Sequence, residues 1–229
     1  MESPRWHVCR SAAEVQERAA AWIGAAAREA ISARGAFHVV LAGGETPRGA
    51  YEGLRDLGTD WRAWHIWFGD ERCLVADDSR RNSRMAGEAL LDHVPIPLAQ
   101  VHAIRAELGA EQAAAEYCLA LAGEPEFDLV LLGLGEDGHA ASLFPGGEWG
   151  ERPDAPDALA VRAAPKPPAE RVSLSARRLG RTQRALFLVT GVGKHGAVRA
   201  WRSGSRLPAA SICPPGGVDV LVEQICIEG

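Results

Sequence analysis

The sequence has 229 residues and a formal net charge of −5, which fits one large α/β domain and argues against nucleic acid as a partner. Its five cysteines are scattered and form no C-x-x-C pair, so we expect neither a zinc ribbon nor a disulfide framework. No apolar run reaches the roughly 20 residues of a membrane span, and residues 1–4 do not resemble a signal peptide, so we expect a reduced, soluble, cytoplasmic protein.

The predicted elements alternate between helices and strands along the chain. Ser11 and Glu14 have capping-box spacing and open an amphipathic helix that Gly35 closes. The predicted strands cover 37–41, 64–68, 129–132, 159–161, 172–174, 185–189 and 218–222. Further predicted helices run through Tyr51 and Leu54, through Met85 and Leu91, over 111–121, and through Val198 and Trp201. This alternation predicts a single domain, 1–229, with a Rossmann-like, doubly wound, mostly parallel sheet and helices on both faces.

The apolar run from Leu129 to Leu132 leads into a loop that contains three glycines, two acids and a histidine. An apolar run bounded by glycine predicts a buried parallel strand, and open α/β sheets bind ligands just past the carboxyl ends of such strands. Asp137 precedes His139 by two residues, and a nearby carboxylate can orient an imidazole and stabilise its cation, as a general base requires. We therefore expect His139 and Asp137 to be catalytic.

The same loop suggests two other kinds of site. Gly133, Gly135 and Gly138 fit G-x-G-x-x-G, but 144–146 (Phe-Pro-Gly) interrupts any long helix, and the next strand has no acid at its end for a ribose. The sequence contains no G-x-S-x-G elbow, and its histidine spacings match no zinc motif. We therefore expect no nucleotide cofactor and no metal, with water as the nucleophile.

Three other strand ends carry glycine and polar residues. The loop 42–47 is similar to a phosphate cradle at a helix start, although a tight βα turn explains it equally well. The segment 68–72 ends in two acids and an arginine, which also fits a structural turn, and 191–194 delivers Lys194, which also fits a solvated helix start. Residues 161–217 hold 11 lysines and arginines against one acid, either as a solvated face or as cations for a small anionic substrate.

Taken in order, these segments resemble the 6-phosphogluconolactonase family over nearly the whole chain. The similar segments are 43–47, 68–72, 79–82, 132–146, 171–175 and 191–194, and the part 137–145 (Asp-Gly-His-x-Ala-Ser-Leu-Phe-Pro) is the most specific. The resemblance implies a cofactor-free hydrolase of the pentose phosphate pathway, which opens 6-phospho-D-glucono-1,5-lactone to 6-phosphogluconate. It also implies a fold similar to that of glucosamine-6-phosphate deaminases.

The resemblance further implies a role for each matching residue. His139 would activate water, with Asp137 orienting it. Phosphate would be held by the backbone of Gly43 and Gly44 and by Thr46 and Lys194, while Arg72 and Arg171 would contact the substrate and Asp70 would shape the site. The expected partner is the small-molecule sugar-phosphate lactone, with no metal, nucleic acid or membrane, and the expected state is a monomer or weak homodimer.

Three positions depart from the family pattern, and two rival functions remain. Ala42 and Glu45 stand where serine is frequent, and Ala140 stands where threonine is frequent, which bears on affinity more than on chemistry. Deaminases typically place Asn-Glu-Pro after the Asp-Gly-His segment, where this chain has Leu-Phe-Pro at 143–145. A non-catalytic sugar-phosphate sensor would be expected to lose the base, and His139 is present.

Overall fold

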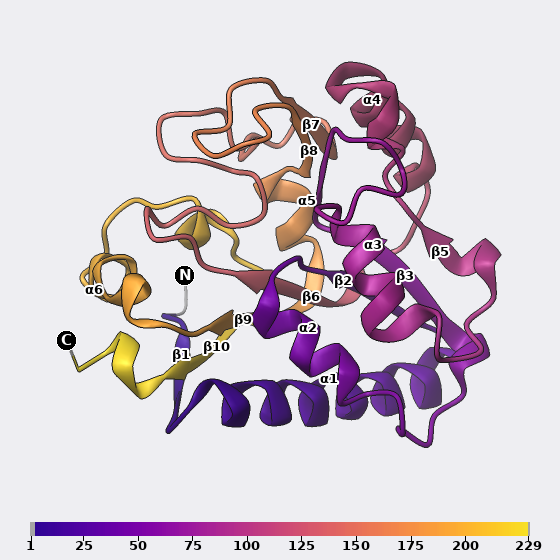
Figure 1. Cartoon of the computed structure of the whole chain (residues 1–229), viewed down its shortest axis with the longest axis horizontal. Helices are drawn as coiled ribbons and strands as arrows, with labels where there is room; N and C mark the ends of the chain where they lie inside the picture. Colours follow the sequence, from indigo (N-terminus) through magenta and orange to yellow (C-terminus); the bar gives the residue numbers. More distant parts are fainter. Residues whose placement is uncertain (1–2, 229) are drawn as a thin grey trace.

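A seven-stranded parallel sheet forms the centre of the molecule (Figure 1). The computed structural model describes residues 3–228, so residues 1, 2 and 229 of the predicted domain 1–229 lie outside the described residues. The strand order is β1 (Arg5–Cys9), β10 (Val218–Glu223), β9 (Thr182–Val189), β6 (Phe127–Gly133), β2 (Phe37–Leu41), β3 (Trp64–Phe68) and β5 (Val101–His102). Every neighbouring pair in this sheet is parallel.

Helices cover both faces of this sheet. α1 (Ala12–Arg34) and α2 (Glu45–Glu52) lie on one face, and α4 (Ala110–Leu121) and α5 (Ala176–Gly180) lie on the other (Figure 1). α6 (His195–Arg202) lies on the face opposite to α1. Trp22 of α1 packs on His7 of β1, whereas Trp201 of α6 packs on Trp6, the residue before His7. Since successive residues of a strand point to opposite faces of the sheet, the two helices cover opposite faces. The predicted fold class, a doubly wound and mostly parallel α/β sheet, is confirmed.

α1 ends where the sequence predicts. The Ser11 side chain accepts a hydrogen bond from the Glu14 N–H, and Gly35 adopts a left-handed φ of 76° while its N–H donates to Ile31. In a complete capping box the Glu14 carboxylate would accept from the N–H of Ser11. Here it accepts from the N–H of Arg10, one residue before the cap. The spacing alone therefore identified the cap but not both of its hydrogen bonds.

A second, three-stranded antiparallel sheet was not predicted as a unit. It consists of β4 (Asp70–Arg72), β8 (Arg171–Leu174) and β7 (Ala158–Val161). The sequence predicted the two later strands, but it assigned β4 to a loop because three consecutive charged residues have no apolar alternation. β4 forms because it pairs with β8, about 100 residues later in the chain, which local sequence cannot reveal.

Other differences are local. The helix predicted through Met85 and Leu91 is α3 (Asn82–Ala86) followed by a π-helical turn over Gly87–Leu91. α2 begins at Glu45, so the second half of the segment predicted as a loop, 42–47, is already helical, with Pro47 in the first turn. β1 was missed because its five residues contain no apolar run. An ion pair between Arg5 and Asp219 and a hydrogen bond between His7 and Asp219 fix it beside β10.

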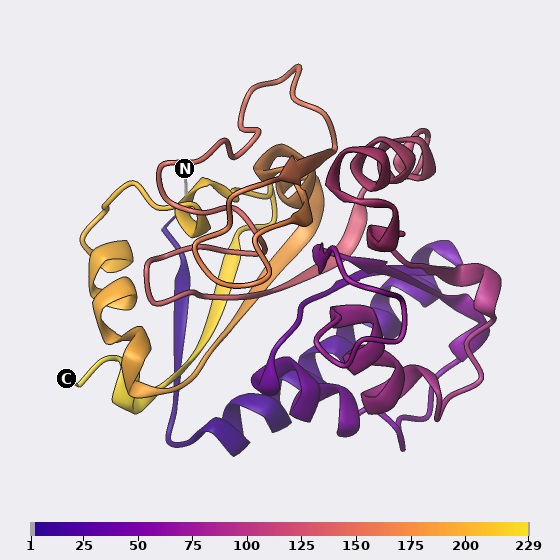
Figure 2. The ribbon, with the colours of Figure 1, turned by 45° about the horizontal axis from the view of Figure 1, so that its top comes forward.

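The sheet topology places a crevice at the carboxyl ends of its central strands. β6 pairs with β9 on one side and with β2 on the other. The chain leaves β6 toward β9 but leaves β2 toward β3, so the loops after β2 and β6 diverge, which is where open α/β sheets bind ligands. Figure 2 shows the two edges of the sheet, with indigo β1 and orange α6 toward one edge and the purple and magenta segments toward the other.

Within residues 3–228, no helix is both long and apolar enough to cross a membrane.

Candidate active site

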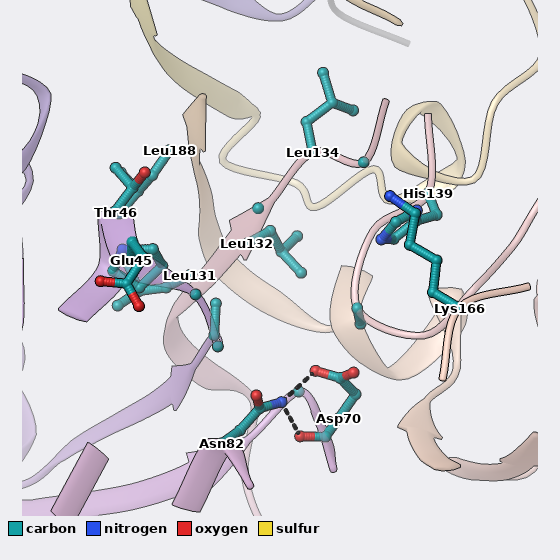
Figure 3. A pocket seen from close by; sticks show the side chains of 18 of the residues that line it. Glu45, Thr46, Asp70, Asn82, Leu131, Leu132, Leu134, His139, Lys166 and Leu188 are labelled. Atoms are coloured by element: carbon teal, nitrogen blue, oxygen red, sulfur yellow. Dashed lines mark hydrogen bonds between the residues drawn. The ribbon is translucent and has the colours of Figure 1, made fainter. Parts of the chain in front are cut away.

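A cavity of about 430 Å³ lies at the carboxyl ends of β2, β3, β6 and β9 (Figure 3). All the predicted site residues except Asp137 line this cavity, namely Gly43, Gly44, Thr46, Asp70, Arg72, His139, Arg171 and Lys194. Asp137 does not line the cavity itself but is bonded to His139, which does. The structure therefore brings residues that follow β2, β6 and β9, together with residues of the small sheet, to one place.

His139 is held by Asp137 through two contacts. Its Nδ1 lies 2.5 Å from Asp137 Oδ1, and its backbone N–H donates to the same oxygen at 3.2 Å. Partial burial raises the pKa of Asp137, but the hydrogen bonds and positive charge of His139 outweigh burial and hold that pKa below its usual value. Asp137 therefore stays ionised, and the neutral imidazole carries its proton on Nδ1 and leaves Nε2 as an acceptor.

The glycines of this loop make room for the imidazole ring. A Cβ atom at Gly135 would lie 2.0 Å from His139 Nδ1, so only glycine fits beneath the ring. The Gly135 N–H donates to the His139 carbonyl at 2.8 Å, and Gly138 adopts a left-handed φ of 84°. Phe144 packs against the ring with 4.7 Å between centroids. The bend expected from 133–138 thus places the histidine, and Ala140 is buried behind it.

The first turn of α2 forms the opposite end of the cavity. Gly44 is the N-cap, with a φ of 110° and no side-chain cap, so the first N–H groups of the helix lack intrahelical partners. Such a helix start attracts anions through its free N–H groups and its dipole. Gly43 is required by close packing, because a Cβ there would lie 1.9 Å from Asn82 Oδ1. Glu45 is exposed at this rim and adds a negative charge to it.

Two hydroxyl groups fix this helix start. Tyr51 Oη accepts from the N–H of Ala42 and donates to its carbonyl, both at 2.9 Å, which holds the loop after β2. Thr46 Oγ1 lies 2.6 Å from Thr190 Oγ1, which ties α2 to the loop after β9. That loop carries Lys194, so the phosphate residues implied by the resemblance are physically connected.

Asp70 is buried and holds the wall together. It accepts from Asn82 Nδ2 at 2.9 Å and from Ser142 Oγ at 2.5 Å. Burial and the charge of Glu71 raise the pKa of Asp70, and the hydrogen bond from Ser142 and the arginines at 171 and 72 only partly oppose this. Asp70 thus links the start of α3 to the loop that carries His139, in keeping with a residue that shapes the site.

The two arginines are engaged mainly by backbone carbonyls. Arg72 donates from Nη1 to the carbonyl of Arg80, and its buried Nε has no hydrogen-bond partner among residues 3–228. Arg171 donates from Nε to Pro168 at 3.1 Å and from Nη2 to Lys166 at 2.9 Å. Both side chains line the cavity, but the structure adds a loop-holding role for Arg171 that the sequence did not suggest.

Both lysines of the chain are in the cavity wall, although the sequence pointed only to Lys194. Burial lowers the pKa of Lys194, and the nearby charge of Lys166 lowers it further, against the opposing pull of Glu136 and Asp137. Sequence reasoning gave no role to Lys166, Asn82 or Thr190. The scarcity of lysine was the one signal that could have identified Lys166. No group of three or more metal-ligating side chains occurs within the described part of the chain.

Comparison with known proteins identifies relatives of the whole chain. A family model described as glucosamine-6-phosphate isomerases/6-phosphogluconolactonase matches residues 10–221. A 6-phosphogluconolactonase from Mycobacterium leprae is 37% identical over 208 residues, which cover 83% of this chain and 82% of that protein. A probable chloroplastic 6-phosphogluconolactonase 3 from Oryza sativa subsp. indica is 37% identical over 74% of this chain, which spans 57% of that longer protein. A crystal structure of 6-phosphogluconolactonase from Thermotoga maritima superimposes with a TM-score of 0.89 at 26% identity, over 97% of this chain and 100% of that one.

Proposed function

The chain belongs to the glucosamine-6-phosphate isomerase/6-phosphogluconolactonase family, and from this premise we propose that it hydrolyses 6-phospho-D-glucono-1,5-lactone to 6-phosphogluconate. The observation that carries the proposal is the pairing of His139 with Asp137 in a cavity whose far side is the start of α2. A base at one end and an anion-binding helix start at the other suit a sugar lactone with a phosphate on its far carbon.

In the proposed reaction, His139 Nε2 removes a proton from water while the water oxygen bonds to the lactone carbonyl carbon. The carbonyl electron pair moves to its oxygen and forms a tetrahedral oxyanion. When this intermediate collapses, the bond from the carbonyl carbon to the ring oxygen breaks. The imidazolium returns its proton to that oxygen, which becomes a hydroxyl group, and the new carboxylic acid releases a proton to solvent.

The phosphate takes no part in the chemistry. Its proposed ligands are the N–H groups around Gly43 and Gly44, the Thr46 hydroxyl and the Lys194 ammonium, with Arg72 and Arg171 as further cations. Binding the phosphate holds the lactone carbonyl near the base and so reduces the entropy cost of the reaction. The exposed carboxylate of Glu45 opposes this binding and is expected to weaken affinity rather than turnover.

The sister activity, deamination of a phosphorylated amino sugar, fits the site less well. The position where such enzymes typically carry a glutamate holds Phe144, which packs on His139 and supplies no carboxylate. Its neighbour Leu143 is fully buried. We therefore retain the lactonase as the proposed function.

The test follows disappearance of the lactone at slightly acid pH, where spontaneous hydrolysis is slow. We expect the protein to accelerate hydrolysis far above a protein-free control. No excess over the control would favour a non-catalytic sensor, and release of ammonia from glucosamine 6-phosphate would favour the deaminase.

Three expectations from the sequence belong to the same proposal: a cytoplasmic location, a single domain over 1–229, and a monomer or weak homodimer. Light scattering after size-exclusion chromatography tests the last of these. A stable tetramer would contradict it.

A further inference from the structure

The chain contains 25 lysine and arginine residues, of which only two, Lys166 and Lys194, are lysines. Both line the candidate active-site cavity. An ammonium group is a compact charge with three donors, whereas a guanidinium is a planar fork suited to bidentate contacts. A chain that otherwise uses arginine therefore presents two compact positive charges to one cavity, and the proposed function assigns a role only to Lys194.

The two ends of the cavity show where the second lysine acts. Figure 3 shows Glu45 and Thr46, from the first turn of α2, on one side of the cavity, and His139 and Lys166 on the other. In this view the Lys166 ammonium projects toward the imidazole. A lactone with its phosphate at the α2 end would present its carbonyl to His139, so Lys166 is a cation at the reacting end. Arg171 also approaches this end, because its guanidinium carbon lies 5.6 Å from the centre of the Phe144 ring that packs on His139, but its donors hold the backbone of the Lys166 loop.

The backbone that carries Lys166 is held in place. Arg171, which is only 7% exposed, donates to the carbonyl oxygens of Lys166 at 2.9 Å, Pro167 at 3.4 Å and Pro168 at 3.1 Å. The Ala164 N–H also donates to the Ala169 carbonyl at 2.9 Å and closes the loop. Lys166 itself is exposed at the cavity rim, so only its side chain needs to move to meet a substrate.

We propose that Lys166 stabilises the oxyanion formed at the lactone carbonyl and afterwards binds the carboxylate of the product, while Lys194 serves the phosphate. This inference rests on the proposed lactonase function. Lys166 exchanges no proton with the substrate, because His139 accounts for both proton transfers. Its attraction grows as charge develops on the carbonyl oxygen, so it acts on the transition state more than on the bound lactone.

The first test compares Lys166→Met with Lys194→Met, two variants that remove a charge but keep the length of the side chain. Each is assayed with 6-phosphogluconolactone and with the same lactone lacking phosphate. Loss of one oxyanion donor typically costs ~10²–10³ in kcat, and for a rim residue we expect at least a ~10-fold loss. Lys166→Met should lower kcat on both lactones, whereas Lys194→Met should raise KM for the phosphorylated lactone alone.

The second test measures binding without turnover, by calorimetry. 6-Phosphogluconate and glucitol 6-phosphate share the phosphate and differ in having a carboxylate or a hydroxymethyl group at the other end. Lys166→Met should abolish the preference for 6-phosphogluconate, whereas Lys194→Met should weaken both ligands equally.

Different results would contradict the role of Lys166 and the proposed function. If the wild-type protein hydrolyses the lactone but Lys166→Met keeps kcat within twofold and keeps the preference for 6-phosphogluconate, the role of Lys166 is wrong and the function stands. If the wild-type protein does not hydrolyse the lactone, the proposed function is wrong, and the role of Lys166 fails with it.

Discussion

Histidines have different surroundings in two regions of the molecule that share strands β2 and β3. In one region the ring is paired with a carboxylate, and in the other the rings stack on one another. Past the carboxyl ends of these strands lies the cavity, where His139 has an ionised partner in Asp137. On the body of the sheet, His38, His65 and His102 stack in a ladder across β2, β3 and β5, with centroids 4.4 Å and 5.9 Å apart. Among residues 3–228 no carboxylate is hydrogen-bonded to these three rings, although Asp128 accepts a hydrogen bond from the backbone N–H of His38.

The surroundings of each ring explain the contrast. Burial lowers the pKa of both His38 and His102, and the neighbouring ring of His65 lowers it further; together they outweigh the charge of Glu124, which acts on both rings, and that of Asp128, which acts on His38. His38 Nδ1 and His102 Nε2 are buried without a hydrogen-bond partner among residues 3–228. Burial thus favours the neutral rings of His38 and His102, whereas His139 has the carboxylate partner that its proposed role as a general base would need. Partner and exposure decide the role of a histidine, so changes at the cavity should affect activity and changes at the ladder should affect stability.

The largest effect in this contrast is expected from Gly135→Ala. The new methyl group would lie 2.0 Å from His139 Nδ1 and displace the ring from Asp137. Because a misplaced general base loses most of a ~10²–10⁴-fold contribution, we expect kcat to fall at least ~100-fold. Lactone hydrolysis by the purified variant measures this.

The matched control is Gly196→Ala in α6, where the same methyl group meets nothing within 4 Å. We expect unchanged activity and a slightly higher unfolding temperature, with a gain below the ~1 kcal/mol by which alanine is favoured over glycine in a helix interior, because Gly196 lies in the first turn of α6. Equal activity in Gly135→Ala and this control would show that the position of the ring does not depend on Gly135.

The second prediction concerns Glu71, which adjoins Asp70 in sequence but faces the core. It is fully buried, and its carboxylate accepts from the N–H groups of Arg72, Asn82 and Ser83 at 2.8–2.9 Å. Glu71→Gln turns an NH₂ group toward donors and weakens the cap of α3, and we expect a loss of ~2–4 kcal/mol in the free energy of unfolding. Urea titration at pH 7 measures it, and a loss below ~1 kcal/mol would mean that the carboxylate is not needed there.

The smallest effect is the pH dependence of the ladder. Because the pKa values of His38 and His102 are lowered on folding, the unfolded chain binds protons more readily. The stability given by neutral rings is therefore complete above about pH 6.5 and is lost as the pH falls through the lower folded pKa values.

His102→Phe should keep the stacking on Trp67, where the centroids lie 3.8 Å apart, and remove one titrating ring. Compared with the wild type, the variant should therefore lose less of its free energy of unfolding between pH 7.5 and pH 5. This difference should stay below ~1 kcal/mol, because these rings are only partly buried. Parallel urea titrations at the two pH values measure it. An unchanged pH dependence would indicate that the ladder does not couple to proton uptake, and lactonase activity at pH 7.5 should equal that of the wild type.

The sequence predicted those parts of the molecule whose cause is local. β6 follows from its apolar run, α1 from Ser11 and Gly35, and the partnership of His139 and Asp137 from their spacing. All of these depend on residues within a few positions of one another.

What the sequence missed depends on distant partners. β4 exists through its pairing with β8, and Gly43 is needed because Asn82 packs on it. Arg171 fits a substrate contact by resemblance, yet its donors largely hold the loop of Lys166. No periodicity or motif encodes such contacts, because each is created when separate segments meet.

The most direct test of the catalytic assignment is the rate of lactone hydrolysis by His139→Gln at slightly acid pH, alongside binding of 6-phosphogluconate. Loss of a general base should lower kcat by ~10²–10⁴-fold, while the unfolding temperature and the dissociation constant of the product stay close to wild type. A variant that hydrolyses the lactone as fast as the wild type would show that His139 is not the base.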